Sequence, residues 1–206
     1  MQITNFNDRY MLTTAVLNGT KTNMRRLEKA LECAVTEYEK QYGEMLEIIT
    51  QYWVEKSKKV CCLTRQGMIL LVGTRYKLNE VVAVAQSYEE IRNERFSEPG
   101  WTNKLFVRPD LMPHQIQITG VRIERLQAIS DDDCLKEGVY YDADVDGYKV
   151  LNLTLPNKGW GRKFRQTYFQ TPREAFAALI NRPGVGRPGL WGKNPWVVVY
   201  TFKLIK

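Results

Sequence analysis

The chain has 206 residues, which is enough for one domain that buries about two thirds of its unfolded surface without disulfide support. Its 30 Lys and Arg against 23 Asp and Glu give a formal net charge of +7, which favours polyanionic partners, although excess charge also keeps proteins in solution. No apolar run approaches the ~20 residues that a membrane span requires, and the first residues lack the basic and apolar regions of a secretory signal. We therefore expect a cytoplasmic protein with reduced cysteines and no membrane partner.

The composition also argues against a metal site or a resident cofactor. The four cysteines show no CxxC spacing and are Cys33, Cys61, Cys62 and Cys134. Cys61 and Cys62 are adjacent in a strand-like run, so their side chains would point to opposite faces. The single histidine, His114, follows Met-Pro, and an isolated imidazole is more often structural than catalytic. We expect no metal and no cofactor.

Residues 19–26 form a small-residue loop that carries three cations, Lys21, Arg25 and Arg26. We interpret this segment as the start of a helix. The helix dipole places positive partial charge at that end, so clustered cations there indicate an anionic or carbonyl-bearing partner. The alternative is a basic first turn that is simply solvated.

Helical spacing follows this loop. Two sets of apolar residues recur at i, i+3, i+4 and i+7, namely Leu27, Ala30, Leu31 and Ala34, and then Met45, Ile48, Ile49 and Tyr52. This pattern predicts two amphipathic helices, or one long broken helix, over about residues 28–57. If the face of residues 45–53 is not packed in the core, it could serve as a docking surface for a protein partner.

Strand patterns begin at residue 60. A β-hairpin is predicted over residues 60–72, with its turn at Gln66-Gly67. Further strands are predicted over residues 81–86, 115–119, 121–126 and 196–204. In the 121–126 segment apolar and charged residues alternate, and we interpret Arg122, Glu124 and Arg125 as surface residues that pair across strands.

Two helix starts are marked by capping residues. Ser130 precedes three aspartates, which predicts an N-cap and a short helix that runs to Glu137 and ends at Gly138. Glu137 would then lie where the negative end of the helix dipole disfavours a carboxylate, so a facing cation such as Lys21 would stabilise it. Thr171-Pro172 predicts the cap and first residue of another helix, through about Asn181.

Between these helices, basic and aromatic residues alternate over residues 158–165, which include Trp160, Arg162 and Lys163. Cations on such a loop can hold phosphates while an aromatic ring stacks on an unpaired base, a combination used to bind single-stranded nucleic acid. The alternative is a loop whose aromatic residues pack into the core.

Four stretches of the chain together resemble the ASCH family, a branch of the PUA-like fold. Gly19, Lys21 and Arg26 match the family's Gly-x-Lys loop, in which an Arg stands five residues after the Lys. The other stretches are Tyr76-Lys77 with residues 80–88, Met112-Pro113 with residues 121–138, and Asn194-Pro195-Trp196-Val197 with the strand after it. They keep the family's order and are similar to its phage and prophage members.

The resemblance implies a single α+β domain over residues 1–206, built as a PUA-like small mixed β-barrel with capping helices. The helices expected over about 28–57 would be an insertion. It also implies a cleft where the Gly-x-Lys loop faces the helix that ends at Glu137. We expect an RNA- or nucleotide-binding module in which Lys21, Arg25 and Arg26 hold a phosphate or a base carbonyl, and Glu137 accepts hydrogen bonds from the base. Trp160, Arg162 and Lys163 would contact the same ligand.

The resemblance leaves enzymatic activity open. Family members that hydrolyse acetylated cytidine use a Lys, a Thr three residues later and a Glu, and here Lys21 and Glu137 match two of these. Met24 occupies the Thr position, and a thioether has no proton to lose, so the family's nucleophile is missing. An amidohydrolase would need Lys21 and Glu137 to activate water directly. A further alternative is that these two residues only form an ion pair that closes the barrel.

Overall fold

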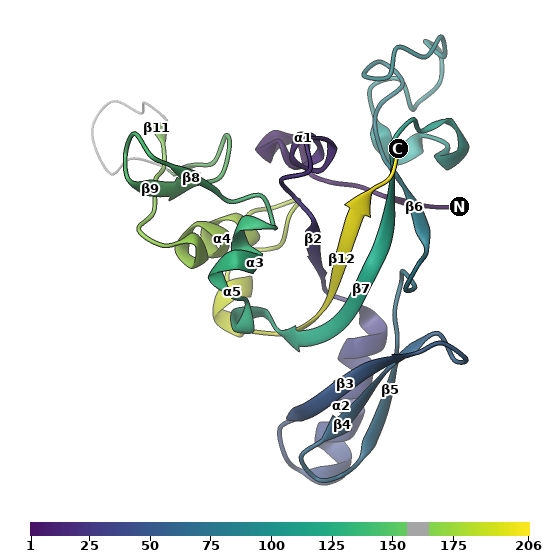
Figure 1. Ribbon diagram of the computed structural model, residues 1–206, viewed down its shortest axis with the longest axis vertical. Coiled ribbons are helices and arrows are strands. Elements are labelled where there is room, and N and C mark those ends of the chain that lie inside the picture. The colour runs from purple at the N-terminus through teal and green to yellow at the C-terminus, as the bar shows by residue number, and fades with distance from the viewer. Residues whose placement is uncertain (156–164) are drawn as a thin grey trace.

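The computed structural model describes residues 1–155 and 165–206, and its class is α+β, as expected. A five-stranded sheet with the order β1-β6-β7-β12-β2 forms its centre (Figure 1). Its strands are β1 (Gln2–Thr4), β6 (Val81–Val84), β7 (Gln115–Arg125), β12 (Trp196–Leu204) and β2 (Asn23–Arg26). β1 and β6 are parallel, and the other neighbouring pairs are antiparallel.

The strand β12 lies between β7 and β2 and is buried on both faces of the sheet. Val198, Val199 and Tyr200 are completely inaccessible to solvent. The strands predicted over residues 81–86 and 196–204 are confirmed, and those predicted over 115–119 and 121–126 are one continuous strand, β7.

The prediction that a helix begins at the Lys21 loop is wrong. A short helix, α1 (Leu12–Leu17), precedes the loop, and residues 23–26 form the strand β2. Hydrogen bonds from Thr22 and Asn23 to the carbonyl of Lys136, together with pairing to β12, extend the backbone at this point. Long-range pairing thus overrides the local pattern, and the next helix, α2 (Lys29–Tyr42), begins only after Glu28.

The second helix predicted within residues 28–57 is also wrong. Its residues form β3 (Ile48–Val54), which pairs with β4 (Lys59–Thr64), and β4 pairs with β5 (Ile69–Gly73). The β-branched and aromatic sequence of β3 favours a strand, and the hairpin offers it a partner. The hairpin itself is confirmed. Ile49 and Tyr52 are 63% and 60% exposed, so the face expected to be a helical docking surface is an exposed part of a sheet instead.

The three-stranded sheet and α2 form one end of the molecule, next to the central sheet (Figure 1). The buried side of α2 carries Leu31, Val35 and Tyr38, which belong to the common hydrophobic core. A side chain also joins the two sheets: Gln51 donates to the carbonyl of Ile123 at 2.7 Å and accepts from its N–H at 2.6 Å. The side-chain amide of Gln51 thus forms hydrogen bonds with the backbone N–H and C=O of Ile123 in β7.

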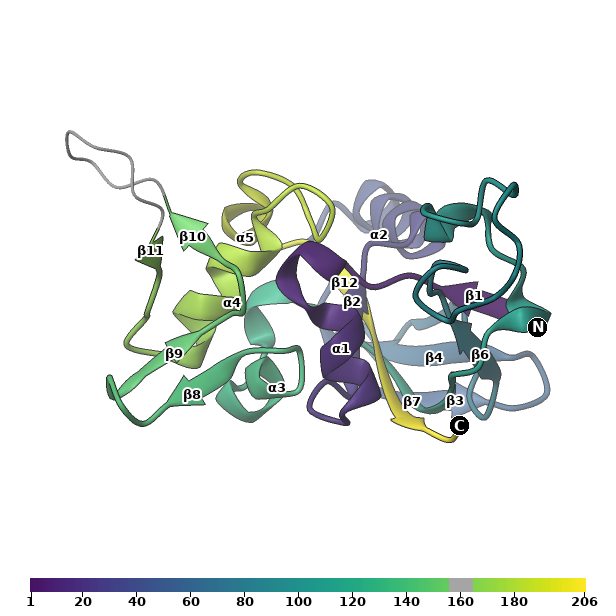
Figure 2. The same ribbon diagram turned by 90° about the horizontal axis from the view of Figure 1, so that it is seen from above.

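The opposite end of the molecule consists of short helices and strands (Figure 2). The helix predicted after Ser130 is present as α3 (Asp131–Leu135), but it ends two residues before Glu137, which lies in the turn that follows. The predicted cap bond is present, since the Ser130 hydroxyl accepts from the N–H of Asp133. The helix after Thr171 is confirmed as α4 (Pro172–Ile180). The remaining elements here are α5 (Leu190–Lys193), β8 (Tyr140–Asp142), β9 (Gly147–Lys149), β10 (Thr154–Leu155), β11 (Arg165–Gln166) and the 3-10 helix η4 (Leu126–Ala128).

Further 3-10 helices are η1 (Asp8–Tyr10), η2 (Lys104–Phe106) and η3 (Pro109–Leu111).

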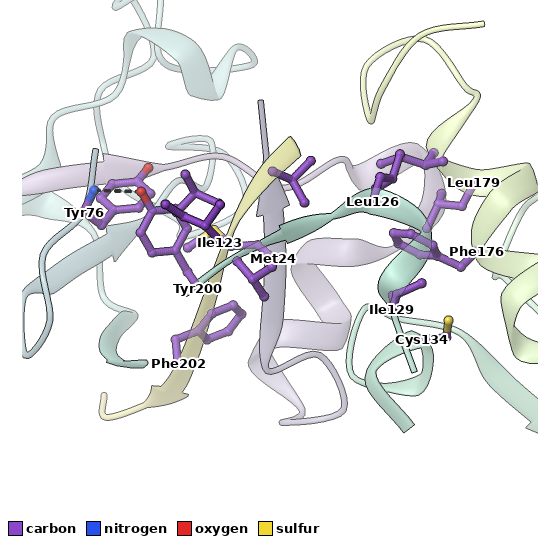
Figure 3. Packing of buried hydrophobic residues seen from close by; sticks show 14 of the residues in the cluster. Met24, Tyr76, Ile123, Leu126, Ile129, Cys134, Phe176, Leu179, Tyr200 and Phe202 are labelled. Atoms are coloured by element: carbon purple, nitrogen blue, oxygen red, sulfur yellow. Dashed lines mark hydrogen bonds between the residues drawn. The ribbon is translucent and has the colours of Figure 1, made fainter. Parts of the chain in front are cut away.

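One hydrophobic core runs through both ends of the molecule (Figure 3). Met24, Tyr200 and Phe202 gather beside the central strands, whereas Phe176 and Leu179 pack against the α3 region. Among the residues that the structure describes, no helix is long and apolar enough to cross a membrane.

Candidate functional site

A cavity of about 330 Å³ lies between β2, the segment after β1, and the helices α4 and α5. Figure 2 shows these elements converging from distant parts of the sequence. Its polar wall carries the four residues expected to form a site: Lys21, Arg25, Arg26 and Glu137. Its other walls are mainly apolar and include Phe6, Leu12, Leu126, Phe176 and Leu179. The volume lies at the lower end of the range for small-molecule sites, ~300–1,000 Å³.

Lys21 and Glu137 meet in the wall of this cavity as a buried ion pair. Lys21 Nζ donates to Glu137 Oε2 at 2.5 Å and to the Glu137 carbonyl oxygen at 2.9 Å. The turn after α1 presents the lysine, and the turn after α3 presents the carboxylate just before Gly138. The two side chains are only 4% and 5% exposed. Burial lowers the pKa of Lys21, although the charge of Glu137 opposes this shift.

Arg25 binds the other oxygen of Glu137 and extends the pair into a network. Its Nη1 lies 2.7 Å from Glu137 Oε1, and its Nη2 and Nε lie 2.7 Å and 3.0 Å from Glu124 Oε1. Nη2 also donates to Asp133 Oδ2 at 3.1 Å. The side chain is 1% exposed. Burial disfavours its charge, but Glu137 and Glu124 outweigh that effect and raise its pKa. Arg25 therefore organises the wall, with each of its nitrogens already bound.

The outer part of this network contains Arg122 and Asp133. Arg122 forms ion pairs with Asp133 and with Glu124, whose Oε2 lies 3.0 Å from Arg122 Nε. Asn23 Nδ2 donates to the other Asp133 oxygen at 3.1 Å. Burial alone would raise the pKa of Asp133, but Arg122 and Arg25 outweigh it and hold that pKa below its ordinary value. The cross-strand surface pairing expected for Arg122 and Glu124 is not what the structure shows: the two residues pair within one strand, β7, in a partly buried network shared with Arg25.

Arg125, the third residue of that expected surface set, pairs elsewhere. Its guanidinium carbon lies 4.6 Å from the centre of the Trp196 ring, on the neighbouring strand β12. Its Nη2 lies 4.0 Å from Glu39 of α2. Arg125 therefore joins the central sheet to α2 and takes no part in the cavity wall.

Arg26 has a different environment because successive residues of a strand point to opposite faces. Its Nη2 donates to the Thr4 hydroxyl at 2.7 Å, and its guanidinium carbon lies 5.5 Å from the centre of the Tyr76 ring. Its Nε is buried and has no hydrogen-bond partner among the described residues. No described carboxylate forms an ion pair with it. Arg26 is thus the cation of the polar wall whose charge is not balanced by the network.

Met24 lies in the cavity wall and is 4% exposed. Its sulfur accepts a weak hydrogen bond from the Thr4 hydroxyl at 3.9 Å. The thioether therefore contributes apolar surface here. Figure 3 shows the Met24 side chain among the core residues next to β12.

The sequence missed several residues of this region. In the sequence, Asp133 was recognised only as part of the N-cap pattern after Ser130. No local pattern indicated that its carboxylate would bind Arg25 and Arg122. Arg187, an exposed residue at the rim of the cavity, lies in the Gly/Pro-rich loop before α5 and carried no signal beyond its charge. Three residues expected to bind nucleic acid, Trp160, Arg162 and Lys163, lie outside the described residues.

Among the residues described, no group of three or more His, Cys, Asp or Glu side chains is arranged to hold a metal ion. Comparison with models of known protein families, with curated proteins and with solved structures found no match to this chain. Any functional conclusion therefore depends on the cavity and on the charges around it.

Proposed function

We propose that the chain is an RNA- or nucleotide-binding module of the ASCH family, built as a PUA-like small mixed β-barrel with capping helices, and that its cavity holds a base or a phosphate. The observation that carries this proposal is Arg26. Its guanidinium lines the cavity and forms no ion pair with a described carboxylate, so a ligand oxygen there would meet a charge that the described part of the protein leaves unbalanced. Its uncompensated charge favours an anionic or carbonyl oxygen there.

The rest of the cavity suits a nucleobase. Apolar walls such as Phe6 and Phe176 accommodate the faces of a ring, and the volume fits a single nucleoside better than a larger cofactor. Glu137 remains able to accept from the ligand, because its two carboxylate oxygens offer about four lone-pair positions and hold only Lys21 and Arg25. An exocyclic amine or ring N–H can use the remaining positions.

An amidohydrolase is the second candidate, and one observation favours it. Burial lowers the pKa of Lys21, which moves that amine toward the range in which it could accept a proton. Two observations weigh against it. Met24 supplies no nucleophile, and Lys21 is already bound to two oxygens of Glu137. Binding requires neither a nucleophile nor a free base, so we place it first.

The test is the loss of affinity when Arg26 is changed. We expect the protein to bind cytidine 5′-monophosphate and a single-stranded RNA of about twelve nucleotides. Arg26→Met should weaken both by about 10-fold to 150-fold, the loss for a hydrogen bond to a charged group. Isothermal titration calorimetry measures the first ligand and fluorescence anisotropy the second. Arg26→Lys, which keeps the charge but lacks Nε, should give an intermediate loss.

The matched control is Arg65→Met, because Arg65 is 69% exposed and lies in the turn between β4 and β5. Its binding should stay within about twofold of the wild type. Circular dichroism should show that each variant keeps its fold. Equal binding by the wild type and by a folded Arg26→Met variant would contradict the proposal. A wild type that binds neither ligand would also contradict the proposal.

A further inference from the structure

A second hollow, of about 440 Å³, lies beside the cavity at the start of α2 and the end of β5. It is lined by Leu27, Glu28, Lys29, Ala30, Gly73, Thr74, Arg75 and Lys77. Leu27 lines both spaces, so they meet at that residue. The second hollow is therefore adjacent to the proposed base site, with Leu27 between them.

This hollow carries three cations, Lys29, Arg75 and Lys77, and one carboxylate, Glu28. None of these cations forms an ion pair with a described carboxylate. Glu28 is engaged by other groups, since its Oε2 accepts from the backbone N–H of Arg75 at 2.9 Å and its Oε1 from the Tyr200 hydroxyl. The hollow thus has an excess of positive charge that no described side chain neutralises.

One aromatic ring connects the cations of the two sites. The guanidinium carbon of Arg26 lies 5.5 Å from the centre of the Tyr76 ring, and that of Arg75 lies 5.4 Å from the same centre. Two cations, one from each site, therefore lie against the same ring. The hollow also contains the start of α2, which no side chain caps, and this adds positive partial charge.

We infer that this hollow is a second subsite, which binds the phosphodiester backbone of a single-stranded RNA whose base occupies the cavity. This inference rests on the proposed function and specifies it: the ligand is an oligonucleotide strand rather than a free nucleoside. Arg75 and Lys77 follow β5, Lys29 begins α2, and together they hold the phosphates that follow the bound nucleotide. Contacts of this kind give affinity without sequence preference.

The test is a triple variant that removes these charges, Lys29→Gln with Arg75→Gln and Lys77→Gln. The probes are cytidine 5′-monophosphate and a fluorescein-labelled single-stranded RNA of about twelve nucleotides, measured over a series of salt concentrations. RNA affinity should fall by about 10-fold or more at ~0.1 M salt, and the slope of log K against log salt should decrease by about 2, since each phosphate contact contributes ~0.7. Binding of the monophosphate should stay within about twofold.

The matched control removes three exposed cations of α2 and of the turns of the three-stranded sheet that do not line the hollow. These changes are Lys40→Gln with Lys56→Gln and Arg65→Gln. Both triple variants have the same net charge, so a loss in only one of them is local. Equal RNA affinity and equal salt slope in the two variants would overturn the inference. A wild type that binds the monophosphate but binds RNA no more tightly would overturn the inference and leave the proposed function standing. A wild type that binds neither probe would overturn both.

Discussion

At the scale of single residues, two consecutive arginines have opposite roles because they lie on a strand. Arg25 points toward Glu124, Asp133 and Glu137 and has a bond at each of its nitrogens, whereas Arg26 points toward Thr4 and its Nε has no partner among the described residues. In the network around Arg25, Lys21, Arg25 and Arg122 face three carboxylates, and the exposed Lys136 also pairs with one of them, Asp133. The charge at the cavity that no described carboxylate balances therefore comes from Arg26, and from Arg187 at the rim, rather than from the buried cluster of cations.

Asp133 should make the stability of the protein depend on acid pH. Its pKa is lower in the folded state than its ordinary value of 3.8, so its ionised form stabilises the fold above that pH, and this contribution is lost as the pH falls through the folded pKa. We expect Asp133→Asn to lower the free energy of unfolding by about 1.5–3 kcal/mol at pH 7, the loss for a hydrogen bond to a charged group. The difference from the wild type should shrink below about pH 4.

Urea denaturation at pH 7 and at pH 3.5 measures this effect. Asp132→Asn is the matched control, because Asp132 lies in the same helical turn, is exposed and forms no ion pair with a described residue. It should cost less than Asp133→Asn at pH 7. A difference between Asp133→Asn and the wild type that stays constant with pH would show that the carboxylate charge does not stabilise the fold.

The sequence predicted part of this arrangement. The pairing of Lys21 with Glu137 could be anticipated, because a carboxylate after a helix needs a cation and the glycine-flanked loop offers one. The role of Arg25 could not, since an assumed helix places Arg25 and Arg26 at similar positions, whereas in a strand successive side chains point in opposite directions and meet different partners. The contribution of Asp133 depends on contacts between residues more than 100 positions apart.

At the scale of elements, the wrong predictions share a cause. The segment of β2 was interpreted as a helix start, and the residues of β3 are spaced as in an amphipathic helix. However, β2 pairs with β12, which is distant in sequence, and β3 pairs with the hairpin that follows it. Capped helices such as α3 and α4 were predicted correctly, because their signals are local side-chain hydrogen bonds. Periodicity alone does not determine the structure of a short segment whose partner is elsewhere.

The turn after α3 depends on Gly138, whose φ of +98° lies outside the left-handed region that other residues reach. A Cβ at this position would lie 2.9 Å from Leu12 Cδ2, which is buried. We expect Gly138→Ala to lower the free energy of unfolding by about 2–3 kcal/mol. It would also displace Glu137 from Lys21. Chemical denaturation measures the first effect.

Gly43→Ala is the matched control, because Gly43 has a φ of +68° after α2 and no atom lies within 4 Å of the added Cβ. Its cost should be about 1 kcal/mol, the penalty of a left-handed residue without a clash. If the two substitutions cost the same, the close packing of Leu12 against Gly138 is of no consequence for stability.

At the scale of the whole molecule, the central sheet unites two different ends. One end is the sheet β3-β4-β5 with α2, and the other is formed by α3, α4 and α5 (Figure 1). The hydrophobic core includes residues from both. Gln51 adds a polar connection, because its amide bonds to both backbone groups of Ile123.

We expect Gln51→Met to lower the free energy of unfolding by about 1–3 kcal/mol for each backbone group of Ile123 left without a partner. The Ile123 N–H should also exchange faster with deuterium, which nuclear magnetic resonance detects at that position. Gln41→Met is the control, because Gln41 is exposed and its side chain bonds only to Tyr42 among the described residues, and the stability of this variant should change by no more than about 0.5 kcal/mol. Unchanged exchange at Ile123 would mean that the two sheets are held together without Gln51.

The pairing of β2 with β12 has a consequence for biosynthesis. Glu28 and Tyr200, which share a hydrogen bond beside these strands, are 172 positions apart. While the ribosome is still translating the codons for residues 196–204, the loop of Lys21 and the arginines of β2 have no neighbouring strand against which to settle. The nascent polypeptide therefore cannot complete the wall of the cavity until β12 emerges from the exit tunnel.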